Sequence, residues 1–113
     1  MAYTASALSF MIENLKKTVI VTGSQIPICE ARNDGVNNLL SALTIAGHYL
    51  IPEVLLIFDN KILRGNRSTK WTTASFDAFK SPNFYPLGEL GLTINIKWEK
   101  IIPCNQEQKT NFV

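Results

Sequence analysis

The amino-acid sequence predicts an α/β domain with a mostly parallel sheet. Apolar residues recur at helical spacing over residues 2–16 and 35–50, and two short, continuous apolar runs follow these segments at 18–22 and 54–58. Helical segments that alternate with apolar strands are typical of helices covering a parallel sheet. A length of 113 residues favours a single domain.

The first expected helix covers residues 2–16. One face of it carries residues at helical spacing, namely Thr4, Leu8, Met11 and Leu15. Two lysines, Lys16 and Lys17, stand at its end, where cations complement the helix dipole.

The second expected helix covers residues 35–50. Asn33 or Asp34 is expected to cap its start, and Pro52 ends it. The core-facing stripe of this helix is predicted from apolar residues at helical spacing: Val36, Leu39, Leu40, Leu43, Ala46 and Leu50.

The expected strands at 18–22 and 54–58 are apolar on both faces, as in a parallel sheet that is buried on both sides. Asp59 and Asn60 predict a tight turn into a hairpin partner at 61–64. After a loop with a short helix, alternation over 92–97 predicts a half-exposed strand.

Composition excludes several functions. With 11 basic and 9 acidic side chains spread along the chain, there is no basic stripe for nucleic acid. The longest aliphatic or aromatic run, Val54 to Phe58, is too short for a membrane span. The first ten residues lack Lys and Arg, so we expect a cytoplasmic chain with Cys29 and Cys104 reduced. No metal-binding or dinucleotide-binding pattern occurs, so we expect no metal and no cofactor.

The run RGNRSTK, residues 64–70, is the main candidate for chemistry. It suits neither a helix nor a strand, and Gly65 and Asn66 tolerate unusual backbone angles. Its last two residues, Thr69 and Lys70, set an amine beside a hydroxyl, a pairing that serves nucleophilic catalysis. The alternative interpretation is an exposed lysine of no special role.

Further candidates come from loops and side chains near strand ends. Ser24 and Gln25 follow the first expected strand, where ligands bind in open α/β sheets; the alternative is a loop that satisfies its own backbone. Arg64 and Arg67 would either clamp a carboxylate or form weak surface ion pairs. His48, the single histidine, is expected to be a surface residue at a helix end.

Several strings along residues 1 to about 100 resemble the bacterial-type L-asparaginases, particularly the cytoplasmic type I group and its animal relatives. They occur in the family's order: MAYTASALSFM at 1–11, VIVTGSQIP at 19–27, DG at 34–35, RGNR at 64–67, TK at 69–70, FDAF at 76–79 and SPN at 81–83.

This resemblance implies a hydrolase that converts L-asparagine to L-aspartate and ammonia with a threonine nucleophile and no cofactor. It implies a flavodoxin-like three-layer unit and homo-oligomers. It also implies that Lys70 is the catalytic lysine and that Ser24 lies near the substrate amide. The resemblance predicts that residues 1–100 form part of the amino-terminal domain and leaves 101–113 as an unassigned tail.

The sequence differs from the family because it lacks the strings that carry the family's catalytic threonines. The family's catalytic threonines and aspartate lie in GGTIG and HGTDT strings, and neither string occurs in these 113 residues. Two hypotheses follow: the chain is part of an asparaginase, or it is a catalytically inactive short product that associates with full-length asparaginase subunits. In both cases the isolated chain is expected not to hydrolyse asparagine.

Overall fold

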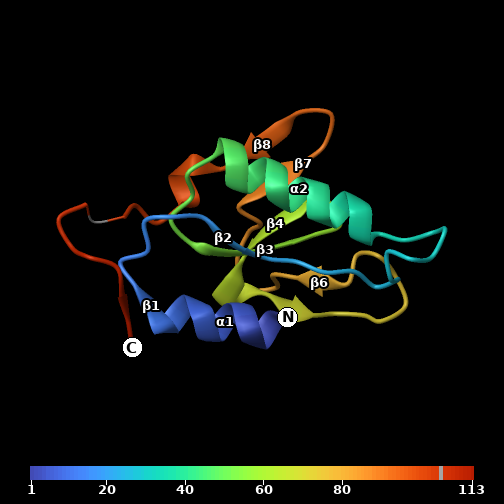
Figure 1. The fold of residues 1–113 in the computed structure, drawn as a ribbon, viewed down its shortest axis with the longest axis horizontal. Helices are drawn as coiled ribbons and strands as arrows, with labels where there is room; N and C mark the ends of the chain where they lie inside the picture. Colours follow the sequence, from blue (N-terminus) through green and yellow to red (C-terminus); the bar gives the residue numbers. More distant parts are fainter. Residues whose placement is uncertain (105) are drawn as a thin grey trace.

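The computed structural model describes residues 1–104 and 106–113. Its main sheet has five strands in the order β2-β3-β4-β7-β8. Their bounds are Val19–Val21, Val54–Phe58, Lys61–Arg64, Gly88–Leu90 and Ile94–Ile96. Figure 1 shows this sheet between two helices, with α2 (Gly35–His48) on one face and α1 (Ala2–Met11) on the other. The result is a mixed α/β domain.

Short elements complete the fold. One small sheet pairs β1 (Ile12–Glu13) with β9 (Asn111–Phe112), and the other pairs β5 (Thr69–Lys70) with β6 (Phe79–Lys80). Two short 3-10 helices, η1 (Gly65–Arg67) and η2 (Trp98–Lys100), follow β4 and β8.

The expectation of a mostly parallel sheet is wrong. Within the main sheet β2 and β3 are parallel, whereas β3–β4, β4–β7 and β7–β8 are antiparallel. After β3 the chain reverses through two residues, Asp59 and Asn60, whose φ angles of 49° and 61° suit a tight hairpin turn. The expected hairpin is therefore confirmed, and this two-residue connection makes β4 antiparallel to β3.

The core lies on both faces of β3, whose five residues are all buried as expected. One buried cluster lies on the α2 side and consists of Ile45, Ile51, Leu55, Ile57, Ile62 and Leu87. The other consists of Leu56, Phe58, Leu63, Ala78 and Phe79, with Ala2 of α1 packed against it. In contrast, β2 is only half-buried, against expectation, because it is the last strand of the sheet.

The first helix is shorter than the predicted span of 2–16. It ends at Met11, after which residues 12–13 form β1 and Asn14 takes a left-handed φ of 56°. Gly65 of η1 lies close to both α1 and β3. A Cβ on Gly65 would lie 3.2 Å from the Ala5 carbonyl oxygen of α1 and 2.7 Å from the Val54 carbonyl oxygen of β3. Ala5 is the buried residue of the helix, whereas Thr4 and Met11 of the predicted face are exposed.

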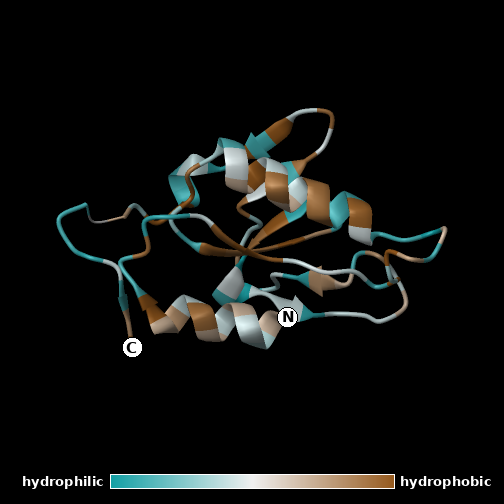
Figure 2. Ribbon diagram, in the orientation of Figure 1, coloured by the Kyte–Doolittle hydropathy of each residue, from teal (hydrophilic) through white to brown (hydrophobic). Residues whose placement is uncertain are grey.

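The predicted core stripe of α2 is also wrong. Val36, Leu39, Leu40, Leu43 and Leu50 are between 46% and 59% exposed. The buried residues of the helix are Gly35, Asn38, Ser41, Ala42 and Ile45. Figure 2 shows apolar segments along the ribbon of α2. Within the part of the chain that the structure describes, neither helix has the length and apolarity to cross a membrane.

Candidate functional site

A pocket of about 430 Å³ brings together the two residues that the sequence singled out for function, Ser24 and Lys70. Ser24 follows β2, and Lys70 ends β5. The remaining lining comes from α1, β3 and the β5–β6 region: Met1, Ala2, Tyr3, Ser6, Phe58, Ser68, Thr69 and Phe79. The pocket thus combines one cation, several hydroxyl groups and an apolar wall.

Lys70 is held at the pocket by its strand and by one side-chain bond. In the β5–β6 pair it lies opposite Phe79, and its Nζ is 5.0 Å from the centre of that ring. Its Nζ donates a hydrogen bond of 2.9 Å to Gln25 Oε1. The Lys70 side chain is exposed, as the surface alternative would have it, and yet it has a defined direction. Thr69 lines the same pocket.

Gln25 links the loop after β2 to the loop after β5. Its Nε2 donates to the carbonyl oxygens of Thr72 and Ser75, at 3.3 and 3.1 Å. Its backbone N–H donates to both carboxylate oxygens of Asp34 at 3.0 Å, and the N–H of Ile26 donates to Oδ1 at 3.0 Å. Charge-assisted bonds of this kind hold a loop in one conformation.

Asp34 is free for this role because Asn33 caps α2. The Asn33 Oδ1 accepts hydrogen bonds from the N–H groups of Gly35 and Val36, at 3.0 and 3.2 Å. Of the two capping residues expected from the sequence, the side chain of Asn33 therefore satisfies the helix start.

Asn38 completes the support beneath the pocket. It is 1% exposed, and its Nδ2 donates to the Gly23 carbonyl oxygen at 2.8 Å. Its Oδ1 accepts from the N–H of Asp59 at 3.1 Å. Neither Asn38 nor this role of Asp34 was predicted from the sequence. Asp34 and Asn38 are four residues apart, directly after the loop that carries Ser24. This spacing places them on one side of the helix and was the signal that could have indicated them.

The two arginine candidates lie elsewhere. Arg64 does clamp a carboxylate, but it is that of Glu53: its Nε and Nη2 donate to Oε1 and Oε2 at 2.6 and 3.2 Å, and both residues are 8% exposed. Arg67 is exposed, with its guanidinium 5.6 Å from the centre of the Phe84 ring. His48 is an exposed residue at the end of α2, as predicted.

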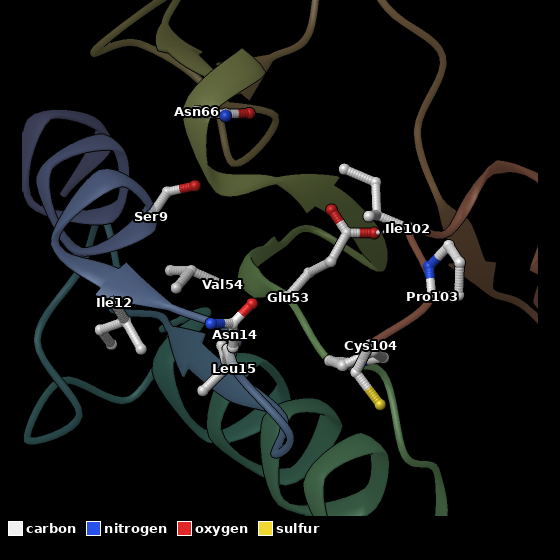
Figure 3. Close-up of a pocket in the computed structure, with 11 residues that line it drawn as sticks. Ser9, Ile12, Asn14, Leu15, Glu53, Val54, Asn66, Ile102, Pro103 and Cys104 are labelled. Atoms are coloured by element: carbon white, nitrogen blue, oxygen red, sulfur yellow. Dashed lines mark hydrogen bonds between the residues drawn. The ribbon is translucent and has the colours of Figure 1, made fainter. Parts of the chain in front are cut away.

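A second pocket, of about 310 Å³, lies beside the Arg64–Glu53 pair and was not predicted from the sequence. Figure 3 shows Ser9 and Ile12 on one side of it, with Ile102 and Pro103 on the other. The Glu53 carboxylate there also accepts from the N–H of Ile102 at 3.0 Å. These bonds occupy both of its oxygens, so this pocket is secondary to the one that holds Lys70.

Among the described residues, the lining of the main pocket contains no His, Cys, Asp or Glu. Among them, no three His, Cys, Asp or Glu side chains are grouped to hold a metal ion. Cys29 and Cys104 are both free. The side chains that line the main pocket offer the Lys70 amine and several hydroxyl groups.

Comparison with known proteins assigns the family. The family model described as "Asparaginase, N-terminal" matches residues 1–102. L-asparaginase 1 of Escherichia coli strain K12 is 63% identical over 94 residues, which are 83% of this chain and 28% of that protein. The 60 kDa lysophospholipase of Homo sapiens is 54% identical over 101 residues, which are 89% of this chain and 18% of that protein.

The fold agrees with this relation. The crystal structure of L-asparaginase I from Vibrio cholerae matches with a TM-score of 0.90 at 52% identity, covering 100% of this chain and 34% of that one. The described domain is thus of the mixed α/β kind found in amidohydrolases of the asparaginase type. The chain belongs to the asparaginase family, in the part that its amino-terminal domain describes. It spans about a third or less of the length of these relatives.

Proposed function

We propose that this chain is part of an L-asparaginase and contributes the Lys70 and Ser24 side of an asparagine-binding site. The observation that carries the proposal is the meeting of these two residues in one pocket of about 430 Å³ within a chain of the asparaginase family. We further propose that the site takes no cofactor and that the chain acts in the cytoplasm, where free Cys29 and Cys104 stay reduced.

The parent reaction is the attack of a threonine hydroxyl on the side-chain amide carbon of asparagine. Ammonia leaves, and water then cleaves the resulting ester to release aspartate. The ammonium group of Lys70 suits the electrostatic side of this reaction, because a fixed positive charge stabilises negative charge that develops nearby. Ser24 supplies a hydroxyl and a backbone group for orienting the substrate amide.

The pocket of this chain has only part of the chemistry. Around it, among the residues that the structure describes, no carboxylate or imidazole contributes to the lining. The family's GGTIG and HGTDT strings, with their threonines and aspartate, are absent from the sequence. We therefore infer that the 113-residue chain alone binds asparagine weakly and does not hydrolyse it.

The test measures hydrolysis and binding separately. The purified chain is incubated with L-asparagine and assayed for ammonia, and we expect none above the rate without protein. In parallel, 1H–15N spectra are recorded during a titration with L-asparagine. We expect shifts to concentrate at Ser24, Gln25 and Lys70.

Two lysine variants make the binding test specific. Lys70→Ala is expected to remove the shifts. Lys80→Ala is the matched control, since Lys80 lies in the paired strand β6 with its Nζ 5.1 Å from the Trp71 ring and outside the pocket lining. If the original chain releases ammonia and Lys70→Ala does not, the proposal that the isolated chain is inactive is wrong. If saturating asparagine causes no chemical-shift changes, the proposed binding site is wrong.

A second candidate function is association with full-length asparaginase subunits as an inactive product. The exposed apolar residues of α2 favour a contact with another protein. Single apolar side chains are common at protein surfaces, but a contiguous row of them is not. Co-purification of the tagged chain with E. coli L-asparaginase 1, with a change in its ammonia production, is the expected result. An unchanged rate and no co-purification would reject this candidate.

A further inference from the structure

We propose that Phe79 is a positioning residue for the reaction at the Lys70 pocket: the face of its ring holds the Lys70 ammonium group in place through a cation–π contact. The proposal rests on the proposed function, in which Lys70 serves as a fixed positive charge. The contacts that support it lie within the β5–β6 pair and in the core beside that pair.

The register of the small β5–β6 sheet places Lys70 directly opposite Phe79. The next pair along the ladder, Trp71 and Ala78, is joined by a hydrogen bond of 2.7 Å from the Trp71 N–H to the Ala78 carbonyl oxygen. Hydrogen-bonded and non-hydrogen-bonded pairs alternate in an antiparallel ladder, so Lys70 and Phe79 form a non-hydrogen-bonded pair, the kind whose side chains lie closer. The backbone therefore brings the amine and the ring together on one face of the sheet.

The Lys70 ammonium group lies over the face of the Phe79 ring. Its Nζ is 5.0 Å from the ring centre, within the range of about 6 Å over which the ring quadrupole attracts a cation. The face of an aromatic ring carries the negative part of that quadrupole, so the attraction has a direction that apolar packing lacks. Gln25 Oε1 accepts a hydrogen bond from the same Nζ at 2.9 Å. The acceptor and the ring together define where the charge lies.

Phe79 offers a rigid support for this charge. It is 5% exposed, and its ring packs edge-on against Phe58, with the ring centres 5.0 Å apart and the planes at 62°. Phe58 ends β3, a strand that is buried along its whole length. A free lysine side chain has many rotamers, and restricting them costs conformational entropy. A ring that is already fixed by the core provides the amine with one preferred position before substrate binds.

The other face of the same small sheet carries a comparable pair outside the pocket. Trp71 and Lys80 alternate with Lys70 and Phe79 along the two strands, and Lys80 Nζ lies 5.1 Å from the centre of the Trp71 ring. Neither Trp71 nor Lys80 is among the residues that line the Lys70 pocket. Trp71→Leu therefore removes a cation–π contact from the same strands and leaves the Lys70 pair intact, which makes it the matched control.

The first experiment replaces Phe79 alone by pentafluorophenylalanine, a ring of nearly the same shape whose face is no longer negative. Relaxation of 13C at the Lys70 Cε measures how strongly the side chain is ordered. In the original chain we expect a higher order parameter for Lys70 than for the exposed Lys17. The fluorinated ring is expected to lower the Lys70 value toward that of Lys17, whereas Trp71→Leu should leave it unchanged.

A second variant, Phe79→Leu, separates packing from the attraction between charge and ring. Loss of Lys70 order in Phe79→Leu but not with the fluorinated ring would show that packing holds the side chain, and would overturn the proposal. Unchanged order in both variants would show that the Gln25 hydrogen bond is sufficient, and would overturn it as well. The fluorinated ring fills the space of Phe79, so the test does not depend on whether Phe79→Leu folds.

Titration with L-asparagine, followed by 1H–15N spectra, tests the connection to the site. We expect the fluorinated ring to raise the asparagine dissociation constant about two- to fivefold, the factor that corresponds to one cation–π contact at an exposed amine, and Trp71→Leu to leave it unchanged. An unchanged constant beside a disordered Lys70 would overturn the positioning role. If the original chain binds no asparagine, the proposed function is wrong and the positioning role falls with it, while the order of Lys70 still decides whether the ring holds the amine.

Discussion

Asn38 is a buried polar residue that supports the Lys70 pocket from beneath. It is 1% exposed and joins three segments: the Gly23 carbonyl oxygen, the Asp34 carboxylate and the N–H of Asp59. Asp59 is in the left-handed region, with a φ of 49°, so its turn benefits from an external hydrogen bond. Ser24 directly follows Gly23, so this amide helps to fix its position.

Asn38→Ala is expected to lower the free energy of unfolding by about 1–3 kcal/mol, because it leaves a carbonyl oxygen and an N–H buried without their partner. The matched control is Asn37→Ala on the same helix. The single side-chain bond of Asn37, to Asn60, is exposed, so its loss should change the free energy by less than about 0.5 kcal/mol. Urea unfolding followed by fluorescence measures both; similar values for the two variants would contradict the role of Asn38.

Three residues that line the candidate pocket, Ser24, Thr69 and Lys70, were singled out from the sequence, whereas their supports were not. Ser24 and Lys70 came from the family strings and from their places after a strand and in a Gly-Asn turn. Asp34 was expected only as a helix cap, and Asn38 was not singled out, because a search for apolar periodicity assigns polar positions of a helix to solvent. Burial of Asn38 depends on hydrogen bonds to two distant loops, which no local pattern records.

The two helices illustrate how packing by small residues differs from packing by large ones. The row of leucines in α2 predicted its buried face, yet the helix lies on the sheet through Gly35, Asn38, Ala42 and Ile45. In α1 the buried residue is Ala5. Helical periodicity correctly predicted that both helices exist, but leucine content did not indicate which side faces the sheet.

Glycine substitutions test this close packing at the level of the elements. Gly65→Ala is expected to destabilise the chain by about 1–3 kcal/mol, because a new Cβ would lie 2.7 Å from the Val54 carbonyl oxygen, a contact that requires backbone movement. Gly47→Ala is the contrasting variant: Gly47 lies in α2 with open space around it, so alanine should stabilise the helix by about 0.5–1 kcal/mol. Thermal unfolding of both proteins gives the sign of each change in stability, and a neutral Gly65→Ala would show that η1 does not pack this closely against β3.

At the scale of the whole molecule, the relative directions of the strands in the main sheet could not be predicted from the pattern of apolar residues along the chain. The strands predicted at 18–22 and 54–58 are observed as Val19–Val21 and Val54–Phe58, and their parallel pairing was expected. The turn at Asp59 and Asn60 indicated the hairpin from β3 to β4, but the return of the chain to β4 as β7, after a long connection, was not predictable, because β7 has no apolar alternation. The resulting main sheet ends at β2 on one side and at β8 on the other, and the core packs on both faces of β3.

Small-angle scattering tests this packing directly. The single chain has a Cα radius of gyration of 14.0 Å. An unfolded chain of 113 residues would have a value of about 34 Å. We expect the value extrapolated to zero concentration to lie close to that of the folded chain, because the core on both faces of β3 holds the sheet and the helices together. A value near that of the unfolded chain would contradict this fold.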